Sequence, residues 1–185
     1  MSTYEFSADY VSYVERFWQQ YLAEFYGRAD VHMLEVGSYE GRSAIWFLEN
    51  LLTHPGSSIT CIDKAYKAVF DRNIQCTGFA DKVIKMTGQS QELLVTLSPQ
   101  QYDIIYIDGS HWAANVWADA LGCWPLVKTG GVIIFDDYRW QIHRPPEERP
   151  KQAIDRFLAE FQTQIEVLHK GYQVIVRKLY DHMRG

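Results

Sequence analysis

Short apolar runs alternate along this chain with stretches in which apolar residues recur at helical spacing. The β-type runs cover residues 31–36, 58–62, 82–86, 102–107 and 132–135, and the helical stretches cover residues 42–52, 65–76, 91–97, 113–121 and 151–161. Strands that alternate with helices in this way build a mainly parallel sheet with helices on both faces. The pattern therefore predicts an α/β fold with three layers.

A further amphipathic stretch precedes the first predicted strand. Apolar residues recur there at helical spacing, and the stretch ends near Gly27. This spacing predicts a helix over residues 10–26 within a leading segment of residues 1–28. The apolar positions that define it are Val11, Val14, Trp18, Tyr21, Leu22 and Phe25.

The C-terminal part of the chain breaks the alternation. Two β-type runs, residues 164–168 and 172–178, are joined by a short segment that contains Gly171, which predicts a closing antiparallel hairpin. Residues 138–150 place three prolines among charged side chains and are expected to form a loop. Because no repeat or shift of composition divides the chain, we expect a single domain over residues 1–185.

Composition narrows the range of partners. The formal net charge is -5 and the basic residues are scattered, so neither nucleic acid nor an anionic membrane is an expected partner. Residues 1–10 lack the pattern of a signal peptide, and we expect a cytoplasmic protein. The three cysteines, Cys61, Cys76 and Cys123, are too few and too widely spaced for a disulfide framework, and we expect them to be small buried hydrophobes.

A glycine-containing segment connects the first predicted strand to the helix that follows it. Glu35 ends the strand, and Gly37 and Gly41 would let the backbone approach a ligand closely. The segment matches neither the dinucleotide fingerprint nor the P-loop, which argues against NAD and ATP. Glu35 would suit a cationic cofactor, whereas a plain strand-to-helix turn remains the alternative.

An acid also ends the second predicted strand. Asp63 occupies the position at which this architecture commonly binds the hydroxyl groups of a ribose. A cofactor that contains ribose is therefore expected. The alternative is that Asp63 caps the following helix.

Two other apolar strands run directly into acids. Asp108 follows the strand at 102–107, and Asp136 with Asp137 follows the strand at 132–135. The carboxyl ends of neighbouring parallel strands meet at one edge of a sheet, so the three carboxylates are expected to converge. Together they favour a hard divalent cation, with Mg²⁺ first and Mn²⁺ or Ca²⁺ as competitors, and the alternative is a set of solvated turn or capping acids.

A histidine close to Asp108 supplies a candidate general base. His111 could take a proton from an acceptor hydroxyl, and its alternative role is a local bond to the backbone at a helix start. His143, in the loop at 138–150, is a reserve base.

These motifs together resemble the class I S-adenosylmethionine-dependent methyltransferases, and the resemblance covers roughly residues 31–178. It implies a Rossmann-like methyltransferase fold with a seven-stranded, mostly parallel sheet. The resemblance implies that the loop after the first strand contacts the methionine part of S-adenosyl-L-methionine, that Asp63 contacts the ribose, and that Ser90 with Gln91 contacts the adenine. The implied cofactor-binding residues are Glu35, Gly37, Ser38, Tyr39, Gly41, Ser43, Asp63, Ser90, Gln91 and Asp108.

Within that class, two residues select a subgroup. Catechol O-methyltransferase-like enzymes end their metal set in Asn and use Lys as base, whereas this chain has Asp137 and His111 at the matching places. It is therefore more similar to the macrolide sugar O-methyltransferase and cephalosporin hydroxylase-like group. The resemblance implies a metal-binding transferase in which Asp108, Asp136 and Asp137 hold Mg²⁺ and His111 with Asp108 is catalytic.

The expected activity is O-methylation of a small hydroxylated molecule such as a sugar moiety or a polyphenol. Tyr138, Arg139 and Trp140 are the expected acceptor contacts, with an exposed loop as the alternative. Two other functions stay open: a metal-independent small-molecule methyltransferase that uses His111, and a catalytically inactive cofactor-binding partner protein. An exposed apolar face on the leading helix would allow a homodimer.

Overall fold

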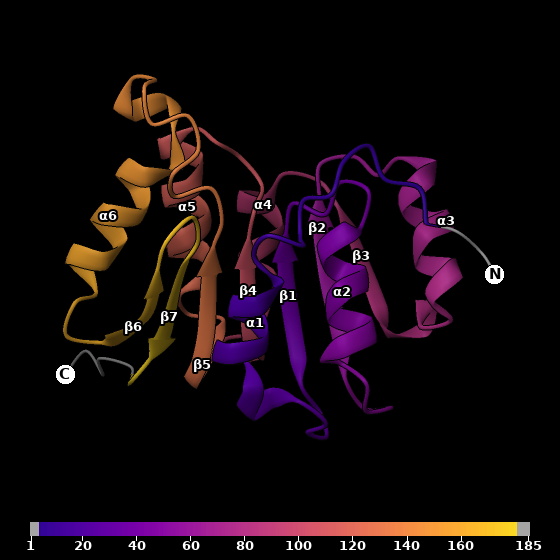
Figure 1. Ribbon diagram of the computed structural model, residues 1–185. Coiled ribbons are helices and arrows are strands. Elements are labelled where there is room, and N and C mark those ends of the chain that lie inside the picture. Colours follow the sequence, from indigo (N-terminus) through magenta and orange to yellow (C-terminus); the bar gives the residue numbers. More distant parts are fainter. Residues whose placement is uncertain (1–3, 181–185) are drawn as a thin grey trace.

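The protein is described by a computed structural model covering residues 4–180, which form one seven-stranded sheet in the order β3-β2-β1-β4-β5-β7-β6 (Figure 1). Strands β1 to β5 pair in parallel, and β7 runs antiparallel to both β5 and β6. This topology confirms the predicted sheet and its closing hairpin. The strands are β1 (His32–Val36), β2 (Ser58–Asp63), β3 (Val83–Thr87), β4 (Tyr102–Ile107), β5 (Val127–Phe135), β6 (Ile165–Lys170) and β7 (Val174–Lys178).

Helices cover both faces of the sheet. Residues of α1, α2 and α3 pack in one apolar cluster against the sheet, and residues of α4, α5 and α6 pack in the other (Figure 1). The three predicted layers are therefore confirmed. The helices are α1 (Glu15–Tyr21), α2 (Arg42–Asn50), α3 (Ala68–Thr77), α4 (Ser90–Leu94), α5 (Ala113–Cys123) and α6 (Pro150–Glu160), with short 3-10 turns at Ala23–Phe25, Ala80–Lys82 and Pro146–Glu148.

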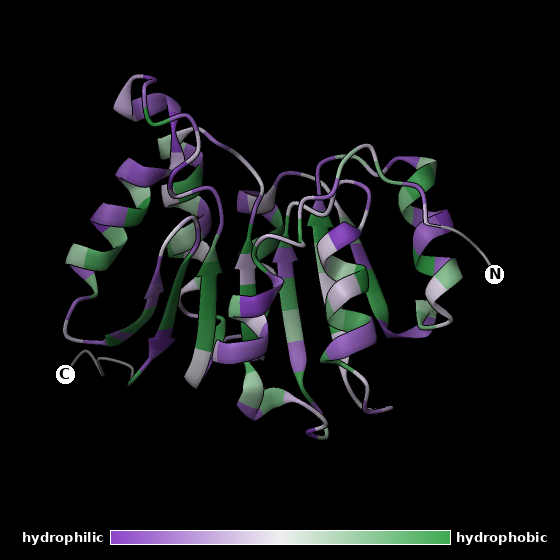
Figure 2. Cartoon of the chain, in the orientation of Figure 1, coloured by the Kyte–Doolittle hydropathy of each residue, from purple (hydrophilic) through white to green (hydrophobic). Residues whose placement is uncertain are grey.

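Strand β4 is apolar apart from Asp103 because both of its faces are covered. Every residue of β4 is buried, and its consecutive residues Ile104 and Ile105 belong to opposite clusters. Successive side chains of a strand point to opposite faces, so a strand between two helical layers needs a continuous apolar run rather than an alternating one. Figure 2 shows that the central strands are mostly apolar, with polar bands in β1, whereas the helices carry both polar and apolar residues.

The leading helix is shorter than predicted. Residues 11–14 form turns, α1 begins at Glu15, and a 3-10 turn follows it. The Asp9 carboxylate accepts the backbone N–H groups of Val11 at 3.1 Å and Ser12 at 3.2 Å, which fixes a turn where the helix was expected to begin. The apolar positions of the predicted stripe are buried all the same, with the exception of the partly buried Tyr21: Val11, Val14, Trp18, Leu22 and Phe25.

Other boundaries differ by a few residues. Strand β5 begins at Val127 rather than at residue 132 because the preceding segment already pairs with β4, Val127 lying opposite Tyr102. The predicted loop at 138–150 contains a single 3-10 turn.

All three cysteines are free thiols, and Cys76 is only partly buried whereas the other two are buried. Among residues 4–180, no helix has the length and apolar character needed to cross a bilayer.

The sheet aligns the ends of its central strands. Val36 at the end of β1 lies opposite Ile107 at the end of β4. The backbone N–H of Asp108 then donates to the Val36 carbonyl at 2.8 Å, and that of Asp136 donates to the Ile107 carbonyl at 3.0 Å. The acids that follow β4 and β5 are thereby placed at the same sheet edge, as the sequence predicted.

Candidate active site

Two adjoining cavities open at the carboxyl edge of the sheet. The larger has a volume of about 490 Å³ and the smaller about 220 Å³, and Gly37 and Gly109 line both. Pockets of this total size are typical for small organic ligands. The predicted residues that line the larger cavity are Gly37, Ser38, Tyr39, Ser43, Asp108, His111, Asp136, Asp137 and Trp140, and those that line the smaller are Gly37, Asp63, Ser90 and Gln91.

The glycine loop, residues 37–41 between β1 and α2, borders both cavities through Gly37. Gly37 has φ +88°, and a β-carbon at this position would lie 2.2 Å from the carbonyl oxygen of Asp108, so only glycine fits. The next residue, Ser38, is buried and lines the larger cavity, and among residues 4–180 its hydroxyl makes no hydrogen bond of ordinary geometry. A buried hydroxyl without such a bond is a site at which a bound ligand would be stabilised.

Two residues of the predicted cofactor set lie behind this loop instead of on a cavity wall. Glu35 is fully buried, accepts a hydrogen bond from Ser43 Oγ at 2.6 Å and contacts Cys61 Sγ at 3.6 Å, and burial raises the pKa of its carboxyl group. Gly41, with φ +83°, precedes α2 and packs against Phe70. Both support the loop: Glu35 holds Ser43, which does line the larger cavity.

Asp63 performs two tasks at once. Its Oδ2 accepts the backbone N–H groups of Ser38 at 3.1 Å and Tyr39 at 2.9 Å, and its Oδ1 accepts that of Ala65 at 3.2 Å. It also lines the smaller cavity. The carboxylate therefore ties the glycine loop to the end of β2 while one side of it faces the space expected to hold a ribose.

At the far side of the smaller cavity lies a residue that the sequence did not single out. The Oδ1 atom of Asp119, on α5, accepts hydrogen bonds from Ser90 Oγ at 2.6 Å and Gln91 Nε2 at 2.7 Å. Burial raises the pKa of Asp119 to about 6, although these two hydrogen bonds oppose the shift. An isolated acid within a helical pattern gives no signal in the sequence, and only the helix packing brings it to Ser90 and Gln91.

The acids after β4 and β5 meet around a tyrosine. Tyr106 Oη lies 3.2 Å from Asp108 Oδ2 and also donates to Asp136 Oδ2, which accepts a second hydrogen bond from Gln173 Nε2 at 3.0 Å. Burial, and then repulsion from the neighbouring carboxylates, raises the pKa of Asp108 well above its ordinary value. The same causes raise the pKa of Asp136 to about 6. Such mutual repulsion would be relieved by a positive charge in this cavity.

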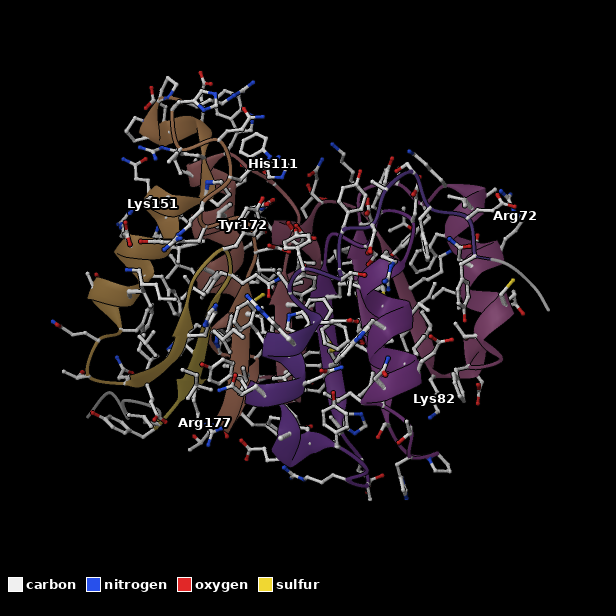
Figure 3. All side chains as sticks on the ribbon, viewed as in Figure 1. Arg72, Lys82, His111, Lys151, Tyr172 and Arg177 are labelled. Atoms are coloured by element: carbon white, nitrogen blue, oxygen red, sulfur yellow. The ribbon has the colours of Figure 1, made fainter. Side chains whose placement is uncertain are left out.

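The third acid contacts the candidate base. Asp137 Oδ2 lies 2.8 Å from His111 Nε2, and Asp137 Oδ1 accepts a hydrogen bond from Tyr172 Oη at 2.8 Å. The His111 ring stacks on Trp140 with centroids 4.1 Å apart. Figure 3 shows His111 and Tyr172 at the upper edge of the sheet, where the parallel strands end. The imidazole is thus held both by a carboxylate and by an aromatic face.

The donor set fits a hard cation in its chemistry, because all three predicted ligands offer carboxylate oxygens. Asp108, Asp136 and Asp137 line the same cavity. Within residues 4–180, however, no group of three or more His, Cys, Asp or Glu side chains is arranged to hold a metal ion. The hydrogen bonds of Asp137 direct its carboxylate toward His111 and Tyr172. Metal binding therefore stays a prediction.

Aromatic side chains line the larger cavity as well. Tyr10 and Tyr13 line it from the leading segment, and Tyr172 lines it from the β6–β7 turn, its ring packing edge-on against Tyr13 at 5.4 Å. Sequence reasoning missed these three tyrosines because no acid or glycine marks them.

Of the three acceptor contacts predicted in the loop at 138–150, only Trp140 lines the cavity. Tyr138 is buried and donates from its hydroxyl to Asp155 on α6 at 2.8 Å, so that it anchors the loop. Arg139 is exposed and lies outside both cavities, as does the reserve base His143. Asp137, directly before the loop, has φ +59°, and Tyr138 lines neither cavity.

A family profile described as a methyltransferase domain matches residues 34–138, which is more than half of the chain. The chain therefore belongs to this methyltransferase-domain family. This membership confirms the resemblance to class I S-adenosylmethionine-dependent methyltransferases. The matched segment runs from β1 to the residue after Asp137 and so includes the glycine loop and all three acids.

Two curated relatives match over part of their length. The chain is 31% identical over 113 residues to catechol O-methyltransferase of Bos taurus, a match that covers 57% of this chain and 40% of that protein. It is 27% identical over 150 residues to the uncharacterized protein R132 of Acanthamoeba polyphaga mimivirus, covering 76% of this chain and 65% of that protein. The chain thus spans less than two thirds of either relative.

Solved structures share the fold. An O-methyltransferase from Bacillus cereus in complex with S-adenosylhomocysteine superposes with a TM-score of 0.71 at 23% identity, over 92% of this chain and 84% of that one. The MycE methyltransferase of the mycinamycin biosynthetic pathway, in complex with Mg and S-adenosylhomocysteine, has a TM-score of 0.69 at 18% identity, over 95% of this chain and 52% of that one. At these identities the likeness establishes the Rossmann-like methyltransferase fold.

Proposed function

We propose that this protein is an S-adenosylmethionine-dependent O-methyltransferase that acts on a hydroxyl group of a small molecule. The observation that carries the proposal is the His111–Asp137 pair, with 2.8 Å between Nε2 and Oδ2, on the wall of a cavity that adjoins the glycine loop. A base held by a carboxylate, next to a loop whose glycine admits a close ligand, is an arrangement that favours methyl transfer to a hydroxyl.

The reaction assigns a task to each group. A lone pair of the acceptor oxygen forms the new O–CH₃ bond while the S–CH₃ bond of the sulfonium breaks, which yields S-adenosylhomocysteine. The hydroxyl proton passes to His111. Because the imidazole nitrogen that faces a carboxylate carries a proton, Nε2 is bound to Asp137 and Nδ1 is the atom that accepts the proton. Asp137 then stabilises the imidazolium.

A divalent cation, Mg²⁺ first, is part of the proposal. Asp108, Asp136 and Asp137 are the residues that would hold it, and their carboxylate oxygens suit a hard ion. When bound, such an ion lowers the pKa of an acceptor hydroxyl and orients it. The cavity supports this proposal because burial and mutual repulsion raise the pKa of Asp108 and of Asp136. The complex of the MycE methyltransferase with Mg supports it by analogy of fold.

One observation favours a second candidate, in which transfer needs no cation. Asp137 is already bound to His111 and Tyr172, so the base is oriented by protein groups alone. In that case Asp108 and Asp136, bridged by the Tyr106 hydroxyl, shape the polar floor of the cavity.

The cavity walls favour a neutral, hydroxylated ring as acceptor. Tyr13, Tyr172 and Trp140 supply flat aromatic faces, and the acids supply hydrogen-bond acceptors for hydroxyl groups. The lining acids outnumber the cations, and Arg42 is paired with Asp9 at 3.3 Å, so an anionic acceptor is disfavoured. A sugar moiety and a polyphenol both satisfy this description.

The test is transfer of a labelled methyl group from S-adenosylmethionine to a panel of sugars and polyphenols, with added Mg²⁺ and with EDTA. Under the leading proposal Mg²⁺ raises turnover, EDTA abolishes it, and Asp136→Ala removes both activity and cation dependence. Turnover that is undiminished in EDTA yet lost in His111→Ala favours the second candidate. If S-adenosylhomocysteine binds but no acceptor is methylated, the protein is a catalytically inactive cofactor-binding partner.

A further inference from the structure

Asp119 is a buried acid that the proposed transfer chemistry does not use. It lies within α5 and is only 1% exposed, yet it borders the smaller cavity. Burying a carboxylate in a helix that packs on a sheet is unfavourable unless polar partners compensate. The partners that it has therefore indicate what it does.

Those partners are the two residues that follow the loop after β3. A single oxygen of Asp119, Oδ1, accepts from both Ser90 Oγ at 2.6 Å and Gln91 Nε2 at 2.7 Å. Close packing of α4 on α5 holds them there, since a β-carbon at Gly122 would lie 2.9 Å from Leu94 Cδ1. Ser90 and Gln91 are thus fixed in orientation as well as in position.

This orientation decides which polar atoms a ligand meets. Burial raises the pKa of Asp119 to about 6, so at pH 7.5 the group is mostly an ionised carboxylate, which can only accept hydrogen bonds. Gln91 must therefore turn its NH₂ group toward Asp119, and Ser90 must direct its hydroxyl proton there. Both residues are left with acceptor oxygens for a ligand in the cavity.

A cavity wall that offers acceptors favours a base with an exocyclic amino group. We propose that Asp119 is a positioning residue that makes the smaller cavity selective for adenine over a purine with a carbonyl group at the same position. It acts by engaging the Ser90 hydroxyl proton and one N–H of the Gln91 amide, which orients the acceptor oxygens of both side chains toward the ligand. This inference rests on the proposed function, which assigns the adenosine part of the cofactor to this cavity.

The test compares two ligands that differ only at that position, S-adenosylhomocysteine and S-inosylhomocysteine, by titration calorimetry at pH 7.5. The wild-type protein is expected to bind the adenosine compound about 10- to 100-fold more tightly, because the carbonyl of the other would face acceptors. In Asp119→Asn the new amide can turn its NH₂ group toward Ser90 and Gln91, which lets Gln91 present its own NH₂ group to the ligand. The preference is expected to fall about 10-fold or more.

A matched control separates this role from a general effect of removing charge. Asp71 on α3 is exposed and paired with Lys85, so Asp71→Asn makes the same chemical change away from the cavities and is expected to keep the wild-type preference. Asp119→Ala is a second variant, should the Asn variant fail to fold, and the free Gln91 amide is expected to lose the preference there as well.

The outcomes are distinguishable. If the role of Asp119 were purely structural, Asp119→Asn would weaken the binding of both ligands equally. An unchanged ratio of the two dissociation constants in this variant would overturn the positioning role while leaving the proposed cofactor intact. A wild-type protein that binds neither ligand would overturn both the inference and the proposed function.

Discussion

Replacing Gly37 by alanine is the sharpest perturbation of the site that the backbone allows. The added β-carbon would lie 2.2 Å from the carbonyl oxygen of Asp108 and 2.6 Å from the Cα atom of Gly109. Both are backbone atoms, so neither can rotate aside. The end of β1 and the turn after β4 would have to separate, and this turn lies between the two cavities.

The magnitude follows from two contributions. A left-handed backbone costs a residue with a β-carbon about 1–2 kcal/mol, and forcing packed groups apart adds about 1–3 kcal/mol. Gly37→Ala is therefore expected to lower the free energy of unfolding by about 2–5 kcal/mol. Gly78 isolates the first contribution, because it has φ +74° and a β-carbon there would meet no atom within 4 Å. Gly78→Ala is expected to cost about 1–2 kcal/mol.

Urea unfolding followed by tryptophan fluorescence gives the free energy of unfolding of both variants and of the wild type. The values can be compared if the dependence of that free energy on urea concentration is the same in all three proteins. The same Gly37 variant should bind S-adenosylhomocysteine at least about 10-fold more weakly, since the shared wall of the cavities moves. Equal destabilisation of the two alanine variants, with unchanged binding, would refute the close approach of the two strand ends.

Three further outcomes are expected. His111→Ala should lower turnover by about 10²- to 10⁴-fold with little change in affinity for S-adenosylhomocysteine, and unchanged turnover would remove the base role. Asp119→Asn should gain stability relative to the wild type as pH rises from about 4 to about 6.5. The raised pKa of the buried Asp119 makes the wild type lose up to about 3 kcal/mol across that window, whereas the variant has no such group. Urea unfolding that gives the same free-energy difference between variant and wild type at pH 4.5 and at pH 7 would contradict this. Phe157→Ala should lower the free energy of unfolding in urea by about 3–5 kcal/mol, because the ring is fully buried in the apolar cluster that contains α4, α5 and α6 and packs against Phe135. A decrease below about 1 kcal/mol would show that its packing was misjudged.

The fold followed from local patterns because each element carries its own signal. The predicted strand at residues 102–107 matches β4 (Tyr102–Ile107) residue for residue, since a strand buried on both faces is mostly apolar and stands out in the sequence. Helix ends were harder to predict. The leading helix was drawn too long because the side chain of Asp9 organises a turn, and such a bond has no periodicity to detect.

Some residues of the candidate site could likewise be predicted from the sequence, and others could not. Asp108, Asp136 and Asp137 were placed together because strand ends meet at one edge, and this needs only the order of strands. Glu35 was expected to bind the cofactor, but it is fully buried, lines neither cavity and accepts a hydrogen bond from Ser43, which does line the larger one. Asp119 and Tyr172 come from a helix and a hairpin far along the chain, and only tertiary packing brings them to the cavities.

The central claim is that the two cavities bind S-adenosylmethionine chemistry, and a thermal melt tests it most directly. The purified protein would be heated with S-adenosylhomocysteine, with and without Mg²⁺, and with NAD and ATP as controls. Ligand at about 100 times its Kd adds roughly 2.7 kcal/mol, which for a domain of this size should raise the Tm by about 5–10 °C. A shift with S-adenosylhomocysteine and none with NAD or ATP is the predicted result, whereas no shift, or a shift with NAD alone, would contradict the account.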